Sequence, residues 1–195
     1  RKESSAASDV YKRQDMGHNV ERICPDLSNA EETFQILRAH MLATDKRELY
    51  SLHKNIMKED LRLNIEKGLA LTEEQISKAQ LSRGALVKNT NDFFEKYDLF
   101  ISPASMVSPF SIKEHWPKKV ENTSFDNYVS WLMTAAAISL TGCPSLAVPC
   151  VKTENNLPIG IQIVAKRRNE SLLVSFGNAF QKHTNNYNIT PIEPG

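Results

Sequence analysis

The chain has 195 residues and a mass of 22.0 kDa, with 41% hydrophobic and 24% charged residues, a composition typical of a folded globular domain rather than a disordered chain. The 24 basic residues nearly balance the 23 acidic ones, and the net charge of +1 indicates no basic surface for nucleic acid. The longest apolar stretch is far shorter than the roughly 20 residues that a membrane-spanning helix needs. We therefore expect neither nucleic acid nor a membrane as a partner.

The three cysteines, Cys24, Cys143 and Cys150, are widely separated and odd in number, which favours reduced thiols and a cytoplasmic protein. Residues 1–14 have no apolar periodicity that joins them to the residues after them, and they resemble a translated sequencing adaptor. We interpret 1–14 as a non-native tail. A disordered natural tail is the alternative.

The first third of the remaining chain predicts a short strand and two helices. Residues 18–23 form an extended run before Pro25, and Ser28 with Glu31 forms a capping box that predicts a helix over 29–43. A second helix comes next, up to Gly68. Its apolar stripe consists of Leu49, Leu52 and Ile56.

A long amphipathic helix comes after Gly68. Thr72 and Gln75 form the best capping box in the chain, and Gly84 within the helix is tolerated. The apolar face contains Ile76, Ala79, Leu86, Phe93 and Tyr97.

The second half predicts short buried strands with helices between them. A strand at 99–102 leads into a loop over 104–124, and a buried helix over 125–140 ends at Gly142. Strands at 145–150 and 159–164 precede a closing helix that Asn169 caps. The residues expected to face inward on that helix are Leu172, Phe176, Ala179 and Phe180. This order of elements predicts one α/β unit, with helices packed around a mixed β-sheet.

No self-contained catalytic motif is present in the sequence. It lacks a Gly-x-Ser-x-Gly elbow, a His-Glu-x-x-His helix, a phosphate-binding glycine loop and a Cys-x-x-Cys pair. The five histidines do not have metal-ligand spacing, so neither a metal nor an organic cofactor is indicated.

The candidate pocket residues are His115, Trp116 and Trp131. His115 and Trp116 are an aromatic pair beside a proline in the long loop, where they could form a rigid edge of a substrate pocket. Trp131 lies on the buried helix, where it is either a core residue or part of an acyl pocket. The alternative for the histidine is an ordinary solvated or hydrogen-bonded side chain.

Three strings in the second half of the chain resemble the C-terminal part of the amidase-signature hydrolases. They are Tyr97–Pro103, Thr141–Pro149 and Leu157–Val164. Weaker similarities precede them in the same order, and the resemblance extends over about 17–181. It implies that 15–195 are the C-terminal portion of a single amidase domain.

The resemblance also implies the chemistry of the whole enzyme. Members of this family hydrolyse a carboxamide C–N bond with a Ser-cis-Ser-Lys triad, through an acyl-serine intermediate and without a cofactor. The triad belongs to a Gly/Ser-rich core upstream of the matched region, so no residue here inherits a catalytic role. The chain is expected to be inactive, to complete the sheet and to line one side of the channel for a small amide substrate.

Two alternatives stay open. The chain is either part of an amidase or a self-standing noncatalytic α/β interaction module; within the family, an amidotransferase A-type subunit is the other choice, although the segment from Asn127 to Trp131 looks more like the stand-alone amidases. A piece of an enzyme should be unstable or aggregate by itself, whereas a module should unfold cooperatively as a monomer. A homodimer is also left open.

Overall fold

The computed structural model describes residues 16–107, 109–120, 122–152 and 157–185. The predicted tail, 1–14, lies outside them. In chain order the elements are α2 (Ala30–Asp45), α3 (Arg47–His53), α4 (Glu59–Leu69), α5 (Glu73–Phe93), β1 (Leu99–Pro103), β2 (Lys119–Val120), β3 (Thr123–Ser124), η1 (Ser130–Leu132), α6 (Met133–Thr141), β4 (Ser145–Lys152), β5 (Pro158–Ala165) and α7 (Glu170–His183).

The main sheet has the strand order β1-β5-β4, and it contains the three strands that the sequence predicts. Ile163 of β5 lies at its centre, paired with Ile101 on one side and Leu146 on the other. Every pairing in the described part is antiparallel, where a mixed sheet was expected. For β4 and β5 the reason is topological, because the connection that joins them is too short for the crossover that parallel neighbours need.

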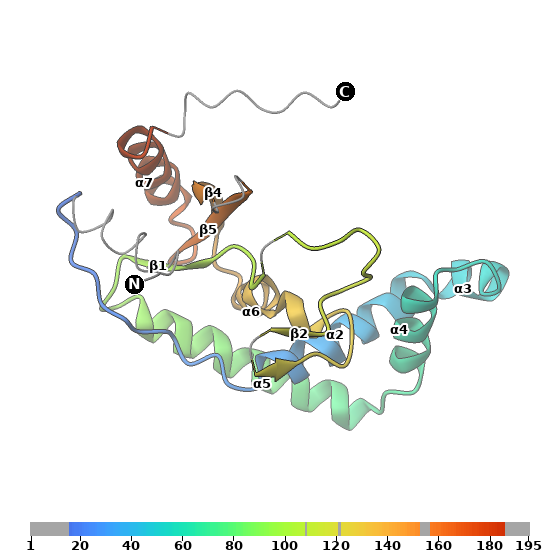
Figure 1. Cartoon of the computed structure of the whole chain (residues 1–195). Coiled ribbons are helices and arrows are strands. Elements are labelled where there is room, and N and C mark those ends of the chain that lie inside the picture. The colour runs from blue at the N-terminus through green and yellow to red at the C-terminus, as the bar shows by residue number, and fades with distance from the viewer. Residues whose placement is uncertain (1–15, 108, 121, 153–156, 186–195) are drawn as a thin grey trace.

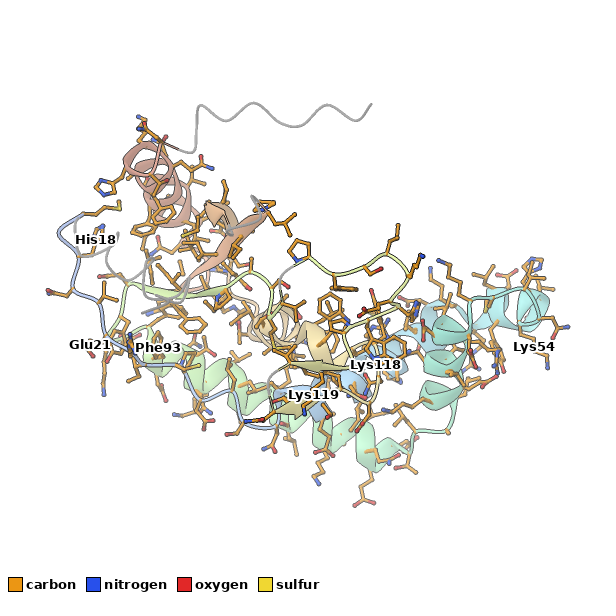
Figure 2. All side chains as sticks on the ribbon, in the orientation of Figure 1. His18, Glu21, Lys54, Phe93, Lys118 and Lys119 are labelled. Carbon is orange, nitrogen blue, oxygen red and sulfur yellow. The ribbon has the colours of Figure 1, made fainter. Side chains whose placement is uncertain are left out.

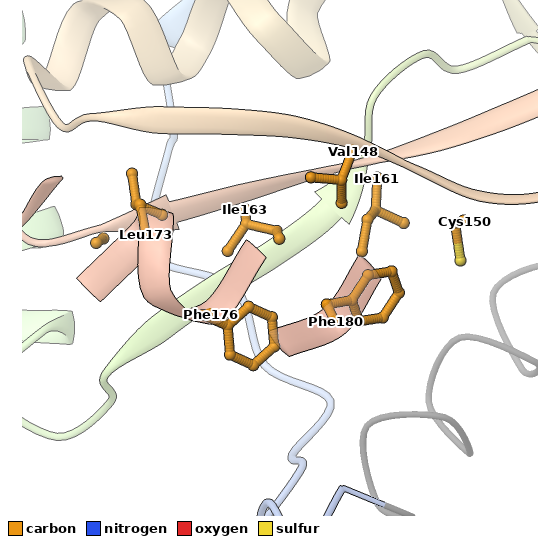
Figure 3. Close-up of a cluster of buried hydrophobic side chains, with 8 residues drawn as sticks. Val148, Cys150, Ile161, Ile163, Leu173, Phe176 and Phe180 are labelled. Carbon is orange, nitrogen blue, oxygen red and sulfur yellow. The ribbon is translucent and has the colours of Figure 1, made fainter. Parts of the chain in front are cut away.

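Helix α7 covers one face of this sheet (Figure 3). The cluster between them consists of Val148, Cys150, Ile161, Ile163, Ala165, Leu173, Phe176 and Phe180. Phe176 and Phe180 face inward as predicted, but Ala179 is exposed and Leu172 only half-buried. Leu173 and Gly177 are buried instead. A Cβ on Gly177 would lie 2.4 Å from the Leu146 side chain, so the glycine allows α7 to approach β4 closely.

The opposite face of the sheet packs on α5 and α6. Val164 of β5 contacts Phe94 at the end of α5 and Ile138 of α6. Beyond this layer, Ala30 of α2 packs with Leu86 of α5. Helices α3 and α4 extend away from the sheet, at the opposite end of the molecule from α7 (Figure 1). The predicted α/β fold class is therefore confirmed.

The crossing of α2 and α4 depends on a glycine. A Cβ built on Gly68 would lie 2.0 Å from the carbonyl oxygen of Ala39 and 2.7 Å from the Cβ of Ala43. The backbones approach each other so closely that no side chain fits between them. Gly68 therefore lies near the end of its helix, as predicted, and it also allows α4 to pack closely against α2.

The predicted start of α2 is wrong in detail. Its N-cap is Asn29, in the left-handed conformation with φ 63°, and no side chain caps the helix. The Glu31 carboxylate accepts a hydrogen bond of 2.5 Å from the Ser130 hydroxyl instead of reaching back to Ser28. The predicted strand at 18–23 is also wrong, because this segment pairs with no strand and is held by the Tyr97 hydroxyl, which donates to Glu21 at 2.8 Å.

The predicted second helix is divided into α3 and α4. Lys58, with φ −56° and ψ 137°, has an extended backbone that separates them, and Glu59 and Asp60 then begin α4, where the helix dipole favours acidic residues. The division leaves the predicted apolar stripe in solvent: Leu52 is 67% and Ile56 82% exposed.

The predicted helix over 125–140 starts later than expected. The Asn127 side chain accepts hydrogen bonds from the backbone N–H groups of Val129 and Ser130, and this turn leads into η1 before α6 begins. Phe125 and Val129 are buried as expected, although they precede the helix. Gly142, with φ 68°, ends α6 as predicted.

Candidate substrate-binding site

Trp131 lies in η1, and the turn at Asn127 fixes its position. Because the Asn127 side chain binds two consecutive backbone N–H groups, the residues on either side are held on one short, tight segment. The Trp131 ring contacts the rings of Phe110 and Tyr128, both edge to face, with centroid distances of 5.7 Å and 6.5 Å.

His115 and Trp116 lie on the connection between β1 and β2. Their rings are in edge-to-face contact, with centroids 5.0 Å apart. Nε2 of His115 contacts the carboxylate of Asp60 at the start of α4, which attaches the connection to that helix. The Lys118 ammonium lies 3.1 Å from the centroid of the Trp116 ring, a cation–π contact. Lys118 lies near the middle of the molecule, between His18 and Lys54 at its two ends (Figure 2).

The three predicted pocket residues belong to one continuous group of rings. His115 contacts Tyr128 at a centroid distance of 5.9 Å, and Tyr128 contacts Trp131. The aromatic cluster, as we name it, consists of Phe110, His115, Trp116, Tyr128 and Trp131. The structure thus brings together residues that the sequence assigned to a loop and to a helix.

Two hydrogen-bond donors of the aromatic cluster have no acceptor. Within the part of the chain that the structure describes, the buried side-chain polar atoms without a partner are the indole nitrogens of Trp116 and Trp131 and the hydroxyl of Ser102. A buried polar group of this kind is uncommon and needs an explanation, because it has lost its hydrogen bond to water. All three lie on the segment from the end of β1 to η1.

Sequence reasoning missed four contributors to this site: Phe110, Tyr128, Asp60 and Lys118. Pro109 restricts the backbone next to Phe110, and Asn127 is a turn residue next to Tyr128, so local signals existed for both rings. Nothing local could have found Asp60, since it is 55 residues from His115 in the sequence.

A polar network joins α3 and α4 away from the aromatic cluster. The Tyr50 hydroxyl donates to Glu66 at 3.0 Å, and the Arg62 guanidinium donates to both carboxylate oxygens of Glu66 at 3.0 and 3.1 Å. These bonds, first from Arg62 and then from Tyr50, hold the pKa of Glu66 below its usual value, while the bond to Glu66 raises the pKa of Tyr50. Tyr50, Arg62 and Glu66 line an open hollow of ≈ 460 Å³, and none of the predicted site residues lines it.

Neither a metal site nor a membrane-spanning helix is found among the described residues. These residues contain no group of three or more His, Cys, Asp and Glu side chains that could hold a metal ion. No helix in this part of the chain is long and apolar enough to cross a membrane. Within these described residues, Cys24, Cys143 and Cys150 form no disulfide bond.

Comparison with solved structures shows the fold. A crystal structure of an amidase superimposes with a TM-score of 0.80 at 20% identity, covering 92% of this chain and 41% of that one. A bacterial aryl acylamidase of the amidase signature family gives a TM-score of 0.76 at 21% identity, covering 92% of this chain and 39% of that one.

Comparison of sequences shows the family. The A subunit of the glutamyl-tRNA(Gln) amidotransferase of Bacillus pumilus is 28% identical over 158 residues, which are 76% of this chain and 31% of the relative. The chain therefore spans less than a third of the length of that relative. The model of the amidase family matches residues 9–174, well over half of the chain. On this match and on the shared fold, the chain belongs to the amidase family.

Proposed function

We propose that this chain is the noncatalytic, substrate-lining portion of an amidase, which as a whole hydrolyses a carboxamide C–N bond through an acyl-serine intermediate. The family match over residues 9–174 carries this proposal. The products are a carboxylate and ammonia or an amine. The three cysteines form no disulfide in the described part of the chain, which supports a cytoplasmic location for the whole protein, since reduced thiols persist in a reducing compartment.

The catalytic serines and lysine are assigned to a part of the protein outside this chain. Nucleophilic catalysis requires a serine within hydrogen-bond reach of its base. Among the hydrogen bonds of the described residues no serine is paired with a lysine: the hydroxyl of Ser105, for example, donates to the carbonyl of Val107. We therefore expect no hydrolysis by the chain alone.

The aromatic cluster is the part of this chain that we assign to the substrate. It combines partly exposed rings with an unused N–H donor, the combination found where a small molecule binds. Its position on a long connection that is attached to α4 through His115 and Asp60 gives it a fixed support.

The experiment that tests this assignment uses the whole protein. The source DNA upstream of the codon for Asp15 is recovered, and the extended reading frame is expressed and assayed for ammonia release. Trp131→Ala should raise KM about tenfold, which corresponds to a loss of about 1.4 kcal/mol of binding free energy. Tyr97→Phe is the control, because Tyr97 contacts Glu21 away from the aromatic cluster. An unchanged KM in Trp131→Ala would contradict the assignment.

A second candidate function is that of an amidotransferase A-type subunit, favoured by the similarity to the amidotransferase of Bacillus pumilus. Such a protein would act with a partner protein and would take ammonia from glutamine. Stable co-purification of the extended protein with such a partner, and ammonia release from glutamine but not from simple amides, would support this candidate over a stand-alone amidase.

A further inference from the structure

We infer that the contact between His115 and Asp60 is a pH-sensitive switch, which holds the connection between β1 and β2 on α4 when His115 is protonated and loosens it when the imidazole is neutral. This regulatory property does not depend on the proposed function. It rests on where the two side chains lie, on their exposure to water and on how the rest of the connection is held.

Asp60 is the fixed partner of this contact. It lies in the first turn of α4, where the helix dipole favours an ionised carboxylate. The Asn64 side chain donates to the backbone carbonyl of Asp60 at 2.8 Å, and α4 is packed tightly on α2 at Gly68. The carboxylate is therefore a negative charge on a well-held element.

His115 is the partner whose charge changes. Its side chain is 60% exposed, so protons exchange freely with water, and imidazole side chains gain or lose their charge between pH 5 and 8. A protonated ring donates from Nε2 to the carboxylate of Asp60 in a charge-assisted hydrogen bond, which is roughly twice as strong as a neutral one. The attachment is therefore stronger at the acidic end of this range.

Asp60 is also the charge that faces His115 most directly. The other rings in contact with His115 are the uncharged rings of Trp116 and Tyr128. The charged neighbours on its own connection are Lys113, Glu114 and Lys118. Glu114 favours a positive charge on His115 and the two lysines oppose it, but all three are exposed, and water and salt weaken such interactions.

The part of the connection next to His115 is held mainly to itself. The backbone N–H of Glu114 donates to the carbonyl of Ser111 at 2.9 Å, and the backbone N–H of Lys113 donates to the Ser111 hydroxyl at 3.3 Å. Ile112 is fully exposed. Loosening the contact with Asp60 therefore lets this part move away from α4 and exposes the neighbouring ring of Trp116, which is half-buried in the attached state.

The test measures how easily acrylamide, an uncharged quencher, reaches the two tryptophans of the chain, Trp116 and Trp131. Fluorescence lifetimes of the 195-residue chain are recorded at 10 °C, at about pH 5.5 and about pH 8. The quenching constant should be about twofold larger at the higher pH, because an exposed ion pair shifts an equilibrium only a few-fold. In 1 M sodium chloride the difference should shrink, because salt screens an exposed pair.

Three variants identify the groups responsible. Asp60→Asn removes the negative charge, and His115→Gln keeps a hydrogen-bond donor that does not titrate. Both should give the larger quenching constant at both pH values. His183→Gln is the control, because His183 ends α7, which lies at the opposite end of the molecule from α4 (Figure 1), and this variant should keep the pH dependence of the parent chain.

Three results would overturn the inference. The first is equal quenching of the parent chain at the two pH values. The second is a pH dependence that persists in Asp60→Asn, since His115 would then act on the tryptophan fluorescence without the contact. The third is a pH dependence that disappears in His183→Gln. None of these results concerns catalysis, so the switch and the proposed function are tested separately.

Discussion

Gly68 and Gly84 are both helical glycines, but their surroundings are opposite. A Cβ on Gly68 would overlap the Ala39 carbonyl, whereas a Cβ on Gly84 meets nothing within 4 Å. We expect Gly68→Ala to destabilise the chain by about 2–3 kcal/mol through overpacking of α2 against α4. Urea unfolding followed by circular dichroism measures this difference.

The matched control for that prediction is Gly84→Ala. Because alanine costs less backbone entropy than glycine in a helix, this variant should be stabilised by about 0.5–1 kcal/mol. If both variants were stabilised, the close approach of α2 and α4 at Gly68 would be wrong.

Glu66 should make the free energy of unfolding of the chain depend on pH in the acidic range. Its pKa is lowered in the folded state by the hydrogen bonds from Arg62 and then Tyr50, so its contribution is present above the ordinary glutamate pKa and is lost as pH falls through the folded value. Glu66→Gln should therefore show a smaller loss of unfolding free energy than the parent chain between neutral and acidic pH. Denaturation curves at several pH values measure it, and an unchanged pH dependence would argue against the network.

At the level of the elements, what the sequence predicts correctly depends on local signals. The start of α5 follows from Thr72 and Gln75, which bind each other's backbone N–H groups at 3.2 and 2.9 Å. The similar signal at Ser28 fails because Glu31 is used by Ser130, 99 residues away. A pattern within four residues cannot reveal a competitor so distant in the chain.

The same reasoning explains the site. The sequence identified His115, Trp116 and Trp131 as aromatic residues near turns, but their connection through Tyr128 and the contact with Asp60 are tertiary. The stripe of Leu49, Leu52 and Ile56 shows the converse error: Leu49 and Leu52 lie in α3, but Ile56 lies beyond the end of that helix at His53, and all three side chains are exposed.

The two capping boxes give a direct prediction. Thr72→Ala removes the acceptor for the Gln75 N–H and should destabilise the chain by about 1 kcal/mol. Ser28→Ala should have almost no effect, because the Ser28 side chain caps nothing in α2. Thermal denaturation of the two variants side by side checks this prediction. An equal loss of stability in both variants would mean that Ser28 caps α2 after all, against the structure.

At the scale of the whole molecule, a packed region and an exposed one coexist. The sheet, α5, α6 and α7 surround buried clusters, whereas large apolar side chains at the α3 end and on the connection after β1 lie in solvent, among them Leu52, Ile56 and Ile112. We propose that these exposed apolar side chains contact a further part of the protein, in keeping with the proposal that the chain is one part of a larger amidase.

We therefore expect the isolated chain to be folded when cold, to bind a hydrophobic dye and to aggregate on warming. Dye fluorescence and light scattering during a slow temperature ramp measure both properties. A self-standing interaction module would instead melt sharply as a monomer without binding the dye.

The most direct test of the central claim is an assay of ammonia release from simple carboxamides, with the purified 195-residue chain and the protein from the extended reading frame side by side. We expect hydrolysis by the extended protein and none above background by the chain alone, because we propose that the chain only lines the substrate channel and that the nucleophile belongs to another part of the protein. Sustained turnover by the chain alone would contradict it.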